Sequence, residues 1–182
     1  MKYVILFLSI TIILSCKKNE TNTSQFPIEV LFKVKSEDKE DLEYFENGLI
    51  PWISIEKAES EVNRLEGKED IVLKANNAVL LIDYPLNKPT EIEIKSDGTS
   101  GFTRKGLCIK ISRAYKRSYE EEEVSAQTKT ISESERKTLR NRNETDGKYG
   151  IWGHDIGDLV MPAAVIRKTD KEKIIIELFI ES

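Results

Sequence analysis

Residues 159–180 read LVMPAAVIRKTDKEKIIIELFI, and this stretch decides the fold. Two apolar runs rich in β-branched residues flank the polar segment 168–172, which is the composition of a hairpin between two strands. The first run is apolar on both faces. Pro162 within it has no N–H to donate, so it requires a sheet edge or a bulge. The sequence therefore predicts a buried C-terminal β-hairpin.

Upstream of the hairpin, four shorter segments have the pattern of strands. Segment 28–34 places apolar residues at every second position, which predicts a half-buried strand. Segment 90–95 alternates in the same way and is expected to face water on one side. Segments 71–73 and 78–82 are short apolar runs joined by KANN at 74–77, a composition that predicts a second hairpin.

Three further segments have the spacing of helices. Ser36 can cap a short acidic helix that runs to Asn47, with Gly48 as its end. Ser54 can cap a second helix, whose apolar residues recur at intervals of three and four: Ile55, Ala58, Val62 and Leu65. The strongest helix begins after Thr103, its predicted N-cap.

The helix that follows Thr103 has one apolar stripe about 140° wide, as a helix that faces a core needs. The members of the stripe are Leu107, Cys108, Ile111, Ala114, Tyr115 and Tyr119. Cys108 is expected to be a buried, inert thiol, because apolar surroundings raise the pKa of a thiol group. Glu122 falls inside the same stripe, where a carboxylate needs a partner if it is buried.

Helical and strand segments do not alternate strictly along the chain, as a parallel β/α fold would require. We therefore expect an α+β fold, with a mostly antiparallel sheet of about six strands and two or three helices packed on one face. Residues 28–182 are enough for a single domain with one core.

The N-terminus, residues 1–20, reads MKYVILFLSITIILSCKKNE. As a helix, the apolar run from Tyr3 to Leu14 would be about 18 Å long, too short for the ~30 Å hydrocarbon core of a membrane. The run is therefore typical of a signal peptide. It ends in Leu14-Ser15-Cys16, which resembles the lipobox of bacterial lipoproteins.

This resemblance covers residues 1–16 only, and it implies that residues 1–15 are removed and that the Cys16 thiol is acylated. Several acyl chains on one residue, such as palmitate, hold a protein firmly at a membrane. We therefore expect the domain to lie in the cell envelope, tied to the membrane by the polar tether 16–27. Lys17 replaces the Asp that signals inner-membrane retention, which favours the outer membrane in a double-membraned cell.

The charge of the chain argues against one class of partner, and its cysteine content limits the disulfides that it can form. The chain has 32 acidic and 28 basic residues, a net charge of −4, whereas a nucleic-acid binder needs a basic face. We therefore expect no nucleic-acid partner. With Cys16 acylated, Cys108 is the only thiol left, so the domain can form no intramolecular disulfide. No motif in the sequence predicts a cofactor.

The single histidine lies in YGIWGHDIGDL, residues 149–159. His154 and Asp155 can form a general base with an orienting acceptor, and Glu122 is a further catalytic candidate. His154, Asp158 and Glu122 are weak candidates for a metal site, because such a site lacks further nitrogen or sulfur ligands. Against both ideas, no nucleophile motif is present, and the three glycines of this stretch favour a tight turn before the buried strand.

Aromatic residues in a glycine-hinged turn are also typical of a recognition surface. The residues that we expect to bind a partner are Tyr149, Trp152, His154 and Asp155. The polar segment before them contains a basic island made of Arg136, Lys137, Arg140 and Arg142. This island is either a solvated loop or a contact for an acidic partner or anionic lipid headgroups.

The sequence as a whole favours a lipid-anchored binding or accessory protein of the cell envelope, without catalytic activity, whose partner is a protein. One specific version is an immunity-type lipoprotein that shields its own cell from an envelope-directed toxin. The alternative is a small hydrolase or metal-dependent enzyme that uses His154, Asp155, Asp158 and Glu122. The enzyme requires a carboxylate close to His154 in an open cleft, whereas the binding protein requires exposed rings at Tyr149 and Trp152.

Overall fold

The structure, a computed structural model, describes residues 26–137 and 141–182. The predicted signal peptide 1–15, the lipidation site Cys16 and most of the tether lie outside the described residues, as does Arg140 of the basic island. None of the helices in the described ranges is long and apolar enough to cross a membrane.

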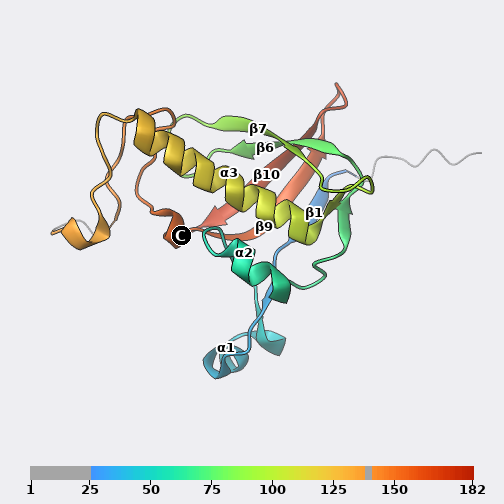
Figure 1. Cartoon of the computed structure of the whole chain (residues 1–182). Coiled ribbons are helices and arrows are strands. Elements are labelled where there is room, and N and C mark those ends of the chain that lie inside the picture. Colours follow the sequence, from blue (N-terminus) through green and yellow to red (C-terminus); the bar gives the residue numbers. More distant parts are fainter. Residues whose placement is uncertain (1–25, 138–140) are drawn as a thin grey trace, which may run out of the picture.

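The C-terminal hairpin lies in the middle of the sheet, as Figure 1 shows. Strands β9 (Val160–Lys168) and β10 (Ile174–Glu181) pair antiparallel within a six-stranded sheet of order β1-β9-β10-β6-β7, in which β4 also pairs with β9. The other strands are β1 (Ile28–Leu31), β4 (Ile53–Ser54), β6 (Asn77–Ile82) and β7 (Thr90–Lys95). The predicted hairpin is therefore confirmed, and it is the centre of the fold.

The sheet is mixed rather than purely antiparallel. β10 runs parallel to β6, and every other pair in this sheet is antiparallel, so the expected α+β fold with about six mostly antiparallel strands is confirmed. The predicted hairpin between segments 71–73 and 78–82 is wrong. Strand β5 (Ile71–Leu73) pairs instead with β8 (Phe102–Thr103), because β7 and β10 occupy both edges of β6.

Pro162 lies at a bulge, one of the two positions that its missing N–H allows. Ala163 pairs with Phe179 and Val160 pairs with Glu181, so two residues of β9 face a single residue of β10. On its other side, the Pro162 carbonyl accepts a hydrogen bond of 2.9 Å from the N–H of Phe32. The proline thus lies inside the sheet without interrupting the pairing of β9 with β1.

Helix α3 (Arg104–Ser125) lies across one face of the sheet (Figure 1). Its N-cap is Thr103, as predicted, and the Thr103 hydroxyl accepts a 3.0 Å hydrogen bond from the N–H of Gly106. The predicted stripe faces the core: Leu107, Cys108, Ile111, Ala114 and Tyr115 are buried, and Tyr119 packs against them. The stripe also carries Glu122 into the protein interior.

The second predicted helix is shorter than expected, because Ser54 belongs to β4. α2 (Ala58–Glu61) continues into the 3₁₀ turn η2 (Val62–Arg64), and all four predicted apolar positions of this segment are buried. The hydroxyl of Ser112 in α3 donates a 2.6 Å hydrogen bond to the Ile55 carbonyl, which holds this segment against α3.

The first predicted helix also begins later than expected. α1 (Lys39–Tyr44) has Asp38 rather than Ser36 as its N-cap, and it is followed by the 3₁₀ turn η1 (Glu46–Gly48). Strands β2 (Val34–Lys35) and β3 (Leu49–Ile50) pair at its base. In Figure 1, α1 lies well apart from the sheet and α3.

Candidate functional site

The stretch 149–159 runs past the C-terminal end of α3, and Glu122 joins the two. Glu122 has an exposed fraction of 0%. Its Oε1 accepts hydrogen bonds from the Thr145 hydroxyl (2.7 Å) and the Gly147 N–H (2.8 Å). Its Oε2 accepts from the N–H groups of Tyr149 (2.7 Å) and Gly150 (3.1 Å). Every partner of this carboxylate is thus a donor in the segment that follows the helix.

These donors decide the charge of Glu122. Burial alone would raise the pKa of this carboxyl group, but the hydrogen bonds from the Thr145 hydroxyl and the three backbone N–H groups outweigh it and hold the pKa below 4.5. Two glycines allow the backbone to approach the Glu122 carboxylate this closely. A Cβ at Gly147 would lie 2.8 Å from the Glu122 carbonyl oxygen, and Gly150 has a φ of +65°.

The neighbouring Glu121 fixes Tyr149 in a second way. Glu121 accepts hydrogen bonds from Lys148 Nζ (2.7 Å), the Tyr149 hydroxyl (2.5 Å) and Arg117 Nε (2.6 Å), and these lower its pKa to about 2. Tyr149 is buried. The expectation of an exposed, partner-binding ring at Tyr149 is therefore wrong, because the ring packs into the core and its hydroxyl is engaged by Glu121.

Asp155 is occupied by arginines of the basic island. Arg136 donates two hydrogen bonds to its carboxylate (2.6 and 2.9 Å), and Arg142 Nε lies 3.9 Å from Asp155 Oδ1. The two arginine side chains are only 4% and 3% exposed. Asp158 is engaged as well, since its Oδ2 accepts from the N–H of Asp155 (2.8 Å). At these two arginines, the basic island is therefore a buried clamp on Asp155.

Arg142 also fastens the polar segment 126–148 to the stretch 149–159. Its guanidinium donates to the Ile151 carbonyl (3.0 Å) and to the hydroxyls of Thr130 (2.5 Å) and Thr145 (3.3 Å). The N–H of Thr145 in turn donates to the Ile151 carbonyl. Both halves of the polar segment are thus held by one buried cation.

His154 lies outside this network of carboxylates. Its ring packs near Tyr84 and Trp152, with centroids 5.5 and 5.7 Å away, and its Nε2 lies 3.5 Å from the Ser182 hydroxyl. Among the described residues, no hydrogen bond or salt bridge joins the imidazole to a carboxylate. His154, Asp155 and Glu122 therefore do not form the arrangement that catalysis would need, because both carboxylates are bound by other donors.

The weak metal candidates are not assembled either. Within residues 26–137 and 141–182, no three side chains of His, Cys, Asp or Glu are grouped so that they could hold a metal ion. Both oxygens of Glu122 accept from protein donors, and Asp158 Oδ2 accepts from the N–H of Asp155.

Cys108 is structural in this arrangement. It is a free, buried cysteine on the core side of α3. Burial raises the pKa of its thiol to about 12. A thiol with that pKa is protonated at neutral pH, so the expectation of an inert cysteine is confirmed.

One part of the expected recognition surface does reach solvent. Trp152 is 37% exposed, and its ring lies edge-on to Tyr84 at 5.4 Å and next to His154. The backbone under this aromatic cluster is fixed, since the Tyr119 hydroxyl donates to the His154 carbonyl (3.0 Å) and the Trp152 N–H donates to the Pro85 carbonyl (3.2 Å). Sequence reasoning missed Tyr84, whose only signal is its position between a strand and a proline.

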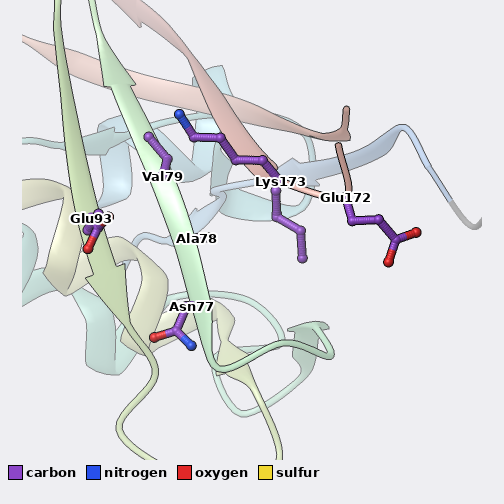
Figure 2. A pocket seen from close by; sticks show the side chains of 7 residues that line it. Asn77, Ala78, Val79, Glu93, Glu172 and Lys173 are labelled. Carbon is purple, nitrogen blue, oxygen red and sulfur yellow. The ribbon is translucent and has the colours of Figure 1, made fainter. Parts of the chain in front are cut away.

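The hollow in Figure 2 lies elsewhere, at one end of strands β6 and β10. It has a volume of about 360 Å³, and its lining consists of Asn77, Ala78, Val79, Glu93, Glu172, Lys173 and Ile174. Lys173 Nζ is paired with Glu91 (2.7 Å), and Glu172 is paired with Lys168 (2.8 Å). The hollow contains none of the predicted site residues and no nucleophile with an adjacent base.

Comparisons of the chain with models of protein families, with curated proteins and with solved structures find no match. Function therefore has to be inferred from the geometry of the described residues. Among the described residues, that geometry offers a polar network whose buried side-chain groups all have hydrogen-bond partners, and a small aromatic cluster of Tyr84, Trp152 and His154 in which Trp152 is exposed.

The Glu122 network predicts a specific dependence of stability on pH. Glu122→Gln should lower the free energy of unfolding by about 2–4 kcal/mol at pH 7, because the amide presents N–H groups to N–H donors. The pKa of Glu122 is lowered in the folded state. The stabilisation is therefore complete above pH 4.5, and it disappears as the pH falls through the pKa of the folded state. Urea unfolding from pH 7 to pH 3 measures this. Glu120→Gln, at an exposed neighbour, is the control, and equal losses for the two variants would contradict the prediction.

The Arg136 clamp predicts a local change. Arg136→Ala should speed cleavage of segment 126–148 by Glu-C protease about tenfold, because the segment loses its bidentate contact with Asp155 and opens more often. Lys137→Ala removes a neighbouring exposed cation and should leave the cleavage rate unchanged. The prediction is wrong if both variants are cut at the wild-type rate.

Proposed function

We propose that this protein is a lipid-anchored binding or accessory protein of the cell envelope, without catalytic activity. The observation that supports the proposal most directly is the state of the carboxylates around the single histidine. Glu122 and Asp155 accept hydrogen bonds from backbone and arginine donors, so neither serves as a partner for His154. The same region also contains the aromatic cluster of Tyr84, Trp152 and His154, in which Trp152 reaches solvent.

The aromatic cluster has the properties of a recognition site. Trp and Tyr side chains supply large contact areas for little loss of conformational entropy, and they dominate the energetics of protein interfaces. Here the backbone at Trp152 and His154 is already held by hydrogen bonds from two other parts of the chain. A partner would therefore meet a preorganised surface, which lowers the entropic cost of binding.

The resemblance of residues 1–16 to a lipobox supports a position of this surface near a membrane. Acylated Cys16 and the tether 17–27 would hold the domain within about 40 Å of the bilayer, since an extended chain spans at most ~3.6 Å per residue. The outer membrane is the proposed location in a double-membraned cell. A specific version of the proposal is an immunity-type lipoprotein, which binds an envelope-directed toxin at the membrane and occludes it.

Lipid anchoring has a direct test. Wild-type protein should fractionate with membranes and incorporate labelled palmitate, whereas Cys16→Ala should remain an unprocessed or soluble precursor without label. Cys108→Ala is the matched control and should behave as wild type, because its thiol is buried in the folded domain. Unchanged fractionation of Cys16→Ala would exclude the anchor.

Recognition at the aromatic cluster can be tested in cells that make the full-length protein. A photo-reactive p-benzoyl-phenylalanine at position 152 should cross-link to a protein partner. The same residue at position 71 should not, although Ile71 is as exposed as Trp152 (41% against 37%). His154→Ala should reduce the adduct, because the His154 ring lies next to position 152 and belongs to the same proposed contact surface. Equal adducts at both positions, or none at 152, would contradict this surface.

A further inference from the structure

Residues 36–52 form an arm that contributes little to the core of the domain. The arm consists of α1, η1 and the segment through β3 to Trp52, and Figure 1 shows α1 at a distance from the sheet and from α3. α1 contains no buried residue. A helix of only six residues is not stable alone in water, and this one gains no burial against the sheet.

The arm nevertheless exposes apolar side chains. Tyr44 is 84% exposed and Leu42 is 49% exposed. Tyr44 lies edge-on to Phe45 at 5.1 Å, and Phe45 lies edge-on to Trp52 at 5.5 Å. The three rings thus form a row whose outer member, Tyr44, lies in solvent. Such an arrangement is typical of a residue that anchors an interface, since Tyr and Trp are enriched among the residues that dominate binding energy.

The conformation of the arm is fixed by polar contacts at its base. The N–H of Ser36 donates to the Gly48 carbonyl (2.8 Å), and the Ser36 hydroxyl donates to Asp41 Oδ2 (2.5 Å). Asp38 caps α1 by accepting from the N–H of Glu40 (2.8 Å). Gly48 closes the turn with a φ of +64°. The backbone that carries Tyr44 is therefore held in place, which reduces the entropy lost when a partner binds.

The charge of the arm indicates what kind of partner fits it. Residues 36–48 contain one lysine, Lys39, and six acidic residues: Glu37, Asp38, Glu40, Asp41, Glu43 and Glu46. Six negative charges less one positive charge give −5, whereas the net charge of the whole chain is −4. The acidic character of the protein is thus concentrated around Tyr44, the most exposed aromatic ring among the described residues.

We propose that the arm, residues 36–52, is a docking element for a protein partner with a basic surface around an apolar pocket. The pocket receives Tyr44 and Leu42, and basic side chains at its rim face the carboxylates of the arm. Opposite charge steers the encounter, and burial of the ring and the leucine side chain stabilises the complex. A second copy of this chain is a poor occupant, because two arms of the same sign repel. Anionic lipid headgroups are disfavoured for the same reason.

This inference rests on the proposed function, since it assumes that the protein works by binding, and it adds a second contact surface to the aromatic cluster of Tyr84, Trp152 and His154. The arm and the cluster share no residues. A partner that engages both would gain affinity from two linked contacts, whereas a partner that engages only one would leave the other surface free. The two surfaces can therefore be tested separately in the same cells.

The experiment uses the full-length protein in cells that make it, with p-benzoyl-phenylalanine at position 44 as the probe. Illumination should give an adduct, and mass spectrometry should locate it on a partner segment of net positive charge. Glu40→Gln, Glu43→Gln and Glu46→Gln together should reduce the adduct about fivefold, because they remove three of the attractive charges. The matched control replaces three exposed acids elsewhere, Glu69→Gln, Glu93→Gln and Glu120→Gln, and should leave the yield unchanged.

Four outcomes would overturn the inference: no adduct at position 44, an adduct with a second copy of the chain, an adduct with lipid, or a yield that falls equally with both sets of substitutions. The parallel probe at position 152 separates this inference from the proposed function. An adduct at 152 with none at 44 leaves the binding protein standing and removes the arm as a docking element. The absence of adducts at both positions would contradict the docking element and the proposed binding function alike.

Discussion

The buried carboxylate of Glu122 determines how the chain is arranged around the C-terminal end of α3. It is a charged group in the last buried turn of a helix, and such a group is tolerated only if enough donors surround it. The donors come from Thr145, Gly147, Tyr149 and Gly150, so the chain after the helix must return to this point before it enters β9. The return of residues 145–150 to the end of α3 and the close approach at Gly147 follow from this requirement.

Local pattern predicted the elements of the fold better than their pairing. The apolar stripe of α3, the C-terminal hairpin and the bulge at Pro162 depend on residues close in sequence, and all three are present. The pairing of β5 with β8 and the parallel contact of β10 with β6 were not predicted. These depend on which strand edges remain free once the core has formed, and the period of a short apolar run contains no such information.

The candidate site shows the same division. The position of Glu122 on the apolar stripe raised the question of a buried carboxylate, and Glu122 is buried. The sequence could not identify its partners, because every residue except proline has an N–H group. The glycines at 147 and 150 were the available signal. Arg136 and Arg142 belonged to an island that looked like a solvated loop, and their burial follows from pairing with Asp155, a contact that only the folded chain creates. Tyr149 was predicted to be exposed but is buried, because its hydroxyl donates a hydrogen bond to Glu121, a contact that also exists only in the folded chain.

The parallel contact between β10 and β6 determines the order in which the sheet can form. β10 is the last strand of the described residues, yet it lies between β9 and β6 in the middle of the sheet. A chain that emerges N-terminus first can pair β6 with β7, but it cannot join that unit to β1 and β9 until residues 174–181 arrive. The central sheet thus stays open, with β6 paired to β7 and β9 paired to β1 as two separate units, until residues 174–181 have been synthesised and can pair with both β9 and β6.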